Sequence, residues 1–296
     1  MAVKFDLSFE GQEADDHLLD FYDAAQAMVG FQRSLAITTH LVVNGSVITQ
    51  APALKNAKIY SEPPKSGSWE ATAIILTGLA GGAFALGTAP KDTPLGHLIS
   101  SAYDYVVSQT LGFHVNYEES LGQTLEHFKR QNPQTPQAAL RETQFDSIIE
   151  KCEVPIRDMH RPIVFSETAG RALITSNVSG SVVQVGPALD EETFAYVSTT
   201  NRGERPQPYE GWVSSYNINT FKGRIYVPDF GRPIPFTLAE EMRTARKVAL
   251  ITTSLNSNAR DRLHEDGRRY FEAFRNESSS GRLKGFHITE MASRQL

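Results

Sequence analysis

Short β-strand patterns repeated after Tyr209 constrain the fold of this chain more than any other feature. Stretches rich in β-branched and aromatic residues recur about every ten residues, and glycine, proline or asparagine separates them. They are residues 209–216, 217–221, 223–227, 233–238, 247–253, 269–275 and 283–290, with one helix expected near 238–246. The pattern predicts a small, mostly antiparallel β-barrel-like domain.

The residues before this region predict an α+β domain. Residues 3–9 alternate apolar and polar side chains, as a half-buried strand does. Asp15 or Asp16 is expected to cap a helix that runs to about residue 43. Further helices are expected at 94–111 and 145–159, and strands at 58–60, 69–76, 171–175 and 181–185. The polar, Pro- and Gly-containing residues 200–208 are typical of a linker, so the predicted domains are 1–205 and 206–296.

Charge is distributed unevenly along the chain. Residues 1–150 contain 9 Lys and Arg against 17 Asp and Glu, whereas the residues from Tyr209 onward contain 14 against 10. This difference predicts two units with different surfaces. The C-terminal excess is smaller than that of a typical nucleic-acid-binding domain. The N-terminus lacks the uninterrupted apolar stretch of a secretory signal, so we expect a cytoplasmic protein.

Motifs of common catalytic sites are missing from the sequence. No glycine-rich loop ends in Gly-Lys-Ser or Gly-Lys-Thr, and no Gly-x-Ser-x-Gly occurs. The eight histidines form no pair at metal-ligand spacing. Cys152, the only cysteine, is flanked by Glu150, Lys151 and Glu153, which do not favour a reactive thiolate. We therefore expect no catalytic residue, no metal and no cofactor.

Basic and aromatic side chains of the C-terminal domain are the candidate binding residues. Cations neutralise phosphates and aromatic rings stack on bases, so a small barrel that carries both suits single-stranded nucleic acid. Interleaved acidic residues such as Glu240, Glu241 and Asp261 reduce the net charge. The candidates are Arg243, Arg246, Lys247, Arg260, Arg262, Arg268, Arg269 and Tyr270.

Residues 71–89 form an uncharged segment of 19 residues, close to the length that crosses a bilayer as a helix. Gly78 and Gly82 also have the spacing of close-packed membrane helices. However, glycine and alanine make the segment weakly hydrophobic. A buried strand ending near Leu76, followed by a glycine-rich turn and a short buried helix, explains it without a membrane.

Several short motifs resemble an uncharacterised two-domain family of bacterial and phage proteins. The resemblance implies an α+β front domain with a Gly-Ser-x-Glu hairpin, followed by a small barrel module, and it implies no activity. The motifs are Gly67-Ser68-Trp69-Glu70, Glu210-Gly211-Trp212-Val213, Lys222-Gly223-Arg224-Ile225 and Arg232-Pro233-Ile234-Pro235-Phe236.

Three functions remain open from these patterns. The first is a non-enzymatic protein-interaction or sensor/adaptor protein of bacterial or phage origin, of the kind found in phage–host conflict. Its protein partner or second copy would bind barrel loops, edge strands or the long amphipathic helix at 16–43. The second is a nucleic-acid-binding protein, and the third is a membrane-acting effector that uses residues 71–89. An enzyme whose catalytic residues meet only in the fold is a further alternative.

Overall fold

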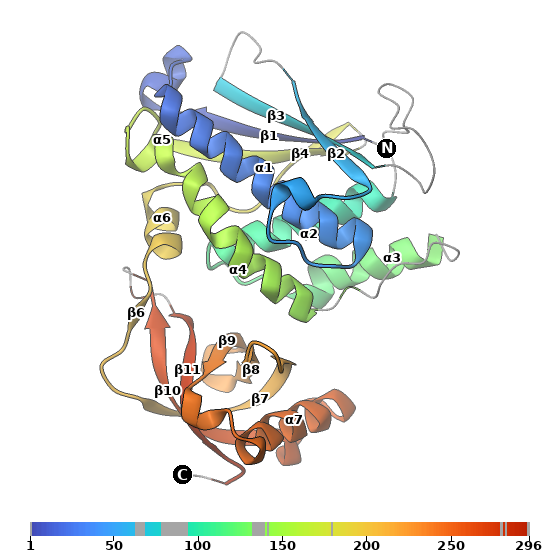
Figure 1. The fold of residues 1–296 in the computed structure, drawn as a ribbon, viewed down its shortest axis with the longest axis vertical. Helices are drawn as coiled ribbons and strands as arrows, with labels where there is room; N and C mark the ends of the chain where they lie inside the picture. Colours follow the sequence, from blue (N-terminus) through green and yellow to red (C-terminus); the bar gives the residue numbers. More distant parts are fainter. Residues whose placement is uncertain are drawn as a thin grey trace. The chain divides into compact units, whose positions relative to one another are not determined.

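Two compact units make up the chain, Met1–Val197 and Ser198–Leu296 (Figure 1). The computed structural model describes residues 2–62, 69–77, 94–131, 140, 142–178, 180–278, 281 and 283–294. The first unit is an α+β unit with an antiparallel sheet, and the second is a five-stranded mixed β-barrel. The predicted fold class is therefore confirmed. The boundary between the units precedes Ser198, whereas the sequence placed it after residue 205.

One antiparallel sheet organises the first unit. Its strands lie in the order β2-β3-β1-β4-β5. The alternation predicted for residues 3–9 is confirmed, because Val3, Phe5, Leu7 and Phe9 of the central strand are at most 1% exposed. One face of the sheet therefore carries the core. The strands are β1 (Ala2–Glu10), β2 (Ala57–Ser61), β3 (Trp69–Thr77), β4 (Arg171–Val178) and β5 (Ser181–Gln184).

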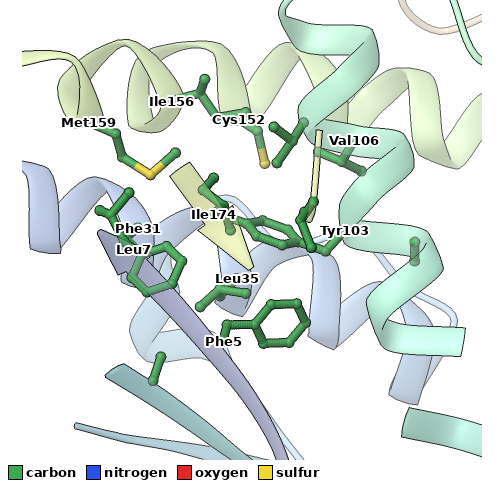
Figure 2. Packing of buried hydrophobic residues seen from close by; sticks show 14 of the residues in the cluster. Phe5, Leu7, Phe31, Leu35, Tyr103, Val106, Cys152, Ile156, Met159 and Ile174 are labelled. Atoms are coloured by element: carbon green, nitrogen blue, oxygen red, sulfur yellow. The ribbon is translucent and has the colours of Figure 1, made fainter. Parts of the chain in front are cut away.

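Helices cover the apolar face of this sheet, and Figure 1 shows α1, α2 and α4 on the same side of it. The described helices of this unit are α1 (Phe21–Asn44), α2 (Pro94–Thr110), α3 (Gln123–Gln131), α4 (Glu142–Met159), α5 (Arg161–Val164) and α6 (Glu191–Ser198). Short 3-10 turns occupy Gln12–Asp16 and Ala51–Ala53, and a π turn occupies Glu118–Gly122. Figure 2 shows β1 side chains Phe5 and Leu7 directed into the same space as Cys152 and Ile156 of α4.

Helix α1 begins later than the sequence indicated. Its N-terminal cap is Asp20, whose Oδ1 accepts a hydrogen bond from the Asp23 amide at 3.0 Å. The predicted caps Asp15 and Asp16 lie in the preceding 3-10 turn instead, so that prediction is wrong. Every residue from 34 to 42 is buried. The second half of α1 is therefore core, and its exposed apolar surface is confined to its first turns.

The uncharged segment 71–89 begins as part of a strand. Residues 71–77 belong to β3, where Ala71, Ala73, Ile75 and Leu76 are buried. Residues 78–89 lie outside the described residues. Within the ranges that the structure describes, no helix is both long and apolar enough to cross a membrane.

Buried His160 makes the stability of the first unit depend on pH. Its Nδ1 lies 2.9 Å from the Ile156 carbonyl and its Nε2 lies 3.0 Å from Thr193 Oγ1. Burial lowers the pKa of His160 to about 4, although the Ile156 hydrogen bond and Asp190 act in the opposite direction. In the unfolded chain the His160 imidazole is therefore protonated below about pH 6.5, whereas in the folded chain it is protonated only below about pH 4.

We expect the free energy of unfolding of the first unit to be unaffected by the titration of this group above pH 6.5. It should fall by about 3 kcal/mol as the pH falls from 6.5 to 4. Chemical denaturation at a series of pH values measures the loss. The His160→Gln variant should have a lower free energy of unfolding at neutral pH and a flatter dependence below pH 6.5. An unchanged slope in that variant would assign the titration to other groups.

Five strands close into a barrel in the second unit. Their cyclic order is β7-β8-β9-β11-β10, and β10 pairs back with β7. The pairing of β9 with β11 is parallel and the other four pairings are antiparallel. The two-residue strand β6 (Asn201–Arg202) pairs with the end of β10. The barrel strands are β7 (Gln207–Asn217), β8 (Lys222–Val227), β9 (Arg232–Leu238), β10 (Arg268–Glu277) and β11 (Leu283–Ala292).

Apolar side chains fill the barrel interior. Val213, Ile225, Ile234, Phe236 and Phe286 are each at most 2% exposed and belong to one core cluster. The outer face and the loops therefore remain for binding. Short 3-10 turns occupy Pro228–Phe230, Glu240–Met242 and Glu265–Gly267.

Residues 247–253, predicted as a strand, belong to helix α7 (Ala245–Arg260) between β9 and β10. Thr244 caps this helix through the Lys247 amide, and Ile251 and Ser254 form its buried side. Ser254 Oγ accepts a hydrogen bond from the Val213 amide at 3.0 Å, which ties the helix to β7. Tertiary packing thus overrides the strand propensity of the β-branched residues. The strand predicted at 217–221 is also wrong, because Ile218 to Phe221 form the turn between β7 and β8.

Candidate functional site on the outer face of the barrel

The basic residues singled out from the sequence do not form one surface. Arg243 precedes α7, Arg246, Lys247 and Arg260 lie in α7, Arg262 follows it, and Arg268, Arg269 and Tyr270 lie in β10. Arg269 is 3% exposed. Its guanidinium donates to the carbonyls of Leu250 at 3.0 Å and Asp266 at 2.9 Å. Arg269 therefore holds α7 and the following turn against β10, and its buried guanidinium is not accessible to a ligand.

Two other predicted cations are engaged by carboxylates. Lys247 forms an ion pair with Glu290 of β11. Arg268 contacts Glu265 at 2.5 Å and Glu210 at 3.7 Å, and its guanidinium lies 5.1 Å from the centre of the Trp212 ring. Tyr270 hydrogen-bonds Arg268. Arg246, Arg260 and Arg262 are exposed.

Strand register brings a different set of side chains together on the outer face. Lys222 of β8 pairs with Thr237 of β9, Thr237 pairs with His287 of β11, and His287 pairs with Phe274 of β10. The Arg202 guanidinium of β6 lies 5.8 Å from the Phe274 ring centre. Neighbours of these residues in the strands, including Phe236 and Phe286, point into the core, so the set points outward. We call Lys222, Thr237, His287, Phe274, Arg202 and the adjacent Arg243 the cationic face.

Hydrogen bonds and charge fix the centre of the cationic face. His287 Nδ1 lies 3.0 Å from Thr237 Oγ1. Burial lowers the pKa of His287, and the charges of Arg202 and Arg243 lower it further, against Glu241. The imidazole is therefore neutral at neutral pH and presents an uncharged ring beside two guanidinium groups.

Arg243 is held beside this centre. Its guanidinium donates to the Leu238 carbonyl from Nε at 3.3 Å and from Nη2 at 3.2 Å. The same group lies 5.2 Å from the centre of the Phe221 ring. The cationic face therefore combines one guanidinium over a ring with guanidinium charge beside a neutral imidazole.

Chemistry that would indicate catalysis has little support among the described residues. Burial raises the pKa of Cys152 to about 12, so this thiol stays protonated at neutral pH and is a poor nucleophile. In the described part of the chain, no group of three or more His, Cys, Asp or Glu residues is placed to hold a metal ion.

Most of the cationic face was missed by sequence reasoning. Four of its residues lie in four different strands, so the sequence contains no local cluster that would indicate them. They are Lys222, His287, Phe274 and Arg202. The alternation of each strand could have indicated which of them point outward. Only the barrel closure shows that they are neighbours. Of the residues chosen from sequence, Arg243 alone belongs to this face.

Comparison with family models matches both units. Residues 5–198 match the Domain of unknown function (DUF7946), and residues 205–292 match the Family of unknown function (DUF7947). No curated protein matches the chain, and no solved structure matches it. The predicted resemblance to a two-domain family of unknown function is therefore confirmed. Because the first model covers more than half of the sequence, the chain belongs to the DUF7946 family and carries a DUF7947 region behind it.

Proposed function

We propose that this protein is a non-enzymatic adaptor whose barrel binds single-stranded nucleic acid and whose first unit contacts a protein partner. The observation that carries the nucleic-acid part is the cationic face. Lys222, Arg202 and Arg243 supply charge, and His287 and Phe274 supply rings on the same outer surface. A single strand exposes both phosphates and bases, so a face that carries cations and rings together fits it.

The connectivity of the barrel supports the same ligand class. Around the closed barrel the strands lie in the order β7, β8, β9, β11 and β10, which are the first, second, third, fifth and fourth barrel strands of the chain. Strands β9 and β11 are parallel, and helix α7 connects β9 to β10. This is the connectivity of the oligonucleotide- and oligosaccharide-binding barrel, which binds ligands on the face of its second and third strands and on two of its loops. Lys222 and Thr237 lie on those two strands here. Because fold alone does not determine function, the side chains of the cationic face carry the proposal.

Unpaired bases distinguish a single strand from a duplex at such a face. In a duplex the bases are stacked inside the helix, so the rings of Phe274 and His287 would have no bases to stack on. We expect a fluorescein-labelled thymidine oligomer of about 15 nucleotides to bind the full chain more tightly than a duplex of the same length. Fluorescence anisotropy measures both affinities. Absence of binding to the single strand at low salt would overturn the nucleic-acid part of the proposal.

Charge reversal on the cationic face should weaken this binding. In the double variant Lys222→Glu and Arg243→Glu, we expect affinity for the thymidine oligomer to fall about tenfold or more. The slope of log affinity against log salt should become shallower by about 1 for each phosphate that the variant no longer binds. The matched control is Arg246→Glu with Arg260→Glu, which changes the net charge equally at exposed positions of α7. Equal losses of affinity in the two double variants would show that net charge, and not this face, governs binding.

We also propose a cellular setting for this protein, the bacterial cytoplasm during phage infection. The family resemblance supports a bacterial or phage origin and a role in phage–host conflict. Plaque counts on a bacterial host with and without the gene test the role in conflict. Fewer plaques with the gene are expected, and equal counts across a panel of phages would remove this part of the proposal.

A further inference from the structure

Large apolar side chains are exposed where α1 begins and α5 ends. Phe21 is 89% exposed, Tyr22 is 62% exposed and Phe165 is 57% exposed. Leu18, just before the helix, is 61% exposed. Single exposed apolar residues need no explanation, whereas a contiguous group of aromatics marks an interaction surface. We call Leu18, Phe21, Tyr22 and Phe165 the aromatic patch.

Arg161 joins the two elements of the aromatic patch. Its guanidinium lies 5.2 Å from the centre of the Tyr22 ring and 4.6 Å from that of Phe165. Arg161 Nε also donates to Asp23 Oδ1 at 2.8 Å. Phe165 packs edge-on against Phe194 of α6, with ring centres 5.8 Å apart. The rings of Tyr22 and Phe165 are thus held in place before a partner arrives, which lowers the entropy lost on binding.

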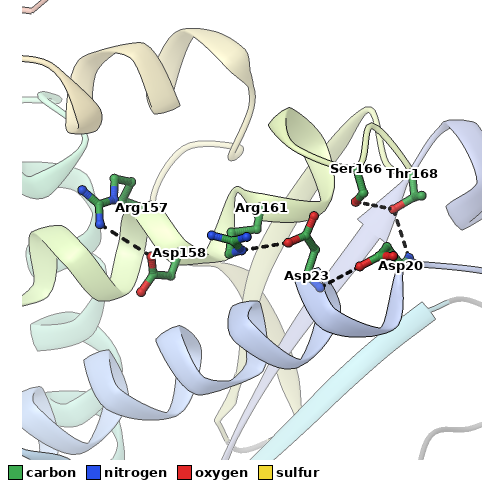
Figure 3. Close-up of polar contacts among 7 residues, drawn as sticks. All are labelled: Asp20, Asp23, Arg157, Asp158, Arg161, Ser166 and Thr168. Carbon is green, nitrogen blue, oxygen red and sulfur yellow. Dashed lines mark hydrogen bonds and ion pairs between the residues drawn. The ribbon is translucent and has the colours of Figure 1, made fainter.

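Polar contacts join the start of α1 to α5 and the residues that follow it, as Figure 3 shows. Asp20 caps α1, and its amide donates to Thr168 Oγ1 at 3.4 Å. Thr168 Oγ1 lies 3.2 Å from Ser166 Oγ. These hydrogen bonds join the residues after α5 to the start of α1, so the two segments that carry the aromatic patch are held next to each other.

Carboxylates surround the start of α1. Residues 10–23 contain six Asp and Glu and no Lys or Arg. Arg171 engages Glu10 at 2.7 Å and Arg161 engages Asp23, whereas Glu13, Asp15 and Asp16 are exposed. A negative rim repels nucleic acid and anionic lipid and attracts a positive partner.

We propose that the aromatic patch docks a protein segment that presents apolar side chains flanked by lysine or arginine. Aromatic residues and Arg are enriched at interface centres, where Tyr and Arg often supply much of the binding energy, and the acidic rim selects a basic partner. This inference rests on the proposed adaptor role and names the chemistry of its protein partner. It does not involve the cationic face, because the two surfaces belong to different units.

Photo-crosslinking tests the docking site in the full chain. Phe21 is replaced by benzoylphenylalanine in cells that express the protein, and crosslinked peptides are sequenced by mass spectrometry. We expect peptides with a net positive charge and apolar residues. Crosslinking should fall about tenfold when Tyr22→Ala is added, or when Glu13→Lys and Asp16→Lys are added together. Benzoylphenylalanine at Val183, an exposed valine of β5, is the matched control site and should not crosslink to the same peptides.

The other outcomes overturn the inference. Crosslinks to acidic peptides, to lipid, to nucleic acid or to a second copy of this chain would each contradict a basic protein partner, as would yields equal to those at Val183. Affinity for the thymidine oligomer is measured on the Tyr22→Ala variant as a separate readout. If that affinity is unchanged while crosslinking disappears, the docking site stands independently of the nucleic-acid face. If the oligomer fails to bind any form of the chain, only the nucleic-acid part fails.

Discussion

Replacing Gly223 with valine is expected to unfold the barrel while the first unit stays folded. A Cβ at this position would lie 2.2 Å from the Ser215 carbonyl oxygen and 2.9 Å from the Phe236 ring. The carbonyl cannot retreat without breaking the β7–β8 ladder, in which Gly223 pairs with Tyr216. Overpacking of this kind costs about 3 kcal/mol or more, a large part of the stability of a small unit.

Hydrogen exchange on the full chain measures this effect unit by unit. Peptides from β7 to β11 should lose protection in the Gly223→Val variant, whereas peptides from β1 and α1 should keep it. The matched control is Gly203→Ala in the same unit, where a Cβ would meet the Arg275 carbonyl oxygen at 3.6 Å, an ordinary contact. Native protection of the barrel in the Gly223→Val variant would contradict the close approach of β7 and β8.

Replacing Gly30 with leucine is expected to unfold the first unit. A Cβ at Gly30 of α1 would lie 2.3 Å from the carbonyl oxygen of Pro155 in α4, so these helices meet where no side chain fits. Even alanine forces the helix backbones apart, and leucine adds a side chain in a filled core. We expect a loss of about 3 kcal/mol or more, measured as a lower denaturation midpoint with loss of protection in α1 and α4.

Gly170→Ala is the control for this substitution. Its Cβ would meet the Glu10 carbonyl oxygen at 3.5 Å, so it should fit without displacing the backbone. Similar midpoints for Gly30→Leu and Gly170→Ala would show that α1 and α4 pack less tightly than the structure requires.

The spacing of apolar residues in the sequence predicted those strands and helices in which buried side chains recur at a regular interval. The alternation of residues 3–9 indicated β1, and the helix predicted at 145–159 is α4, Glu142–Met159. Both signals come from side chains that face one core, so the sequence records them directly. The same reasoning failed at 247–253, where Val248 and Ile251 suggested a strand. There the apolar spacing is also helical, and the contact of Ser254 with β7 decides between the two.

The cationic face was less predictable than the fold because it depends on strand register. Charge density along the sequence pointed to the residues after Leu238, yet Arg269 is bound by backbone carbonyls and Lys247 by Glu290. Lys222 and His287 are far apart in sequence and adjacent only through Thr237 of β9. Strand register is fixed only when the barrel closes, so the sequence alone does not show that these side chains are adjacent.

Photo-crosslinking maps directly where a single strand touches the protein. A thymidine oligomer that contains 4-thiothymidine is bound to the full chain and photo-crosslinked, and the attached peptides are sequenced. We expect crosslinks to peptides that contain Lys222 of β8, His287 of β11 and Phe274 of β10. Crosslinks confined to the first unit, or to the exposed arginines of α7, would contradict binding at the cationic face.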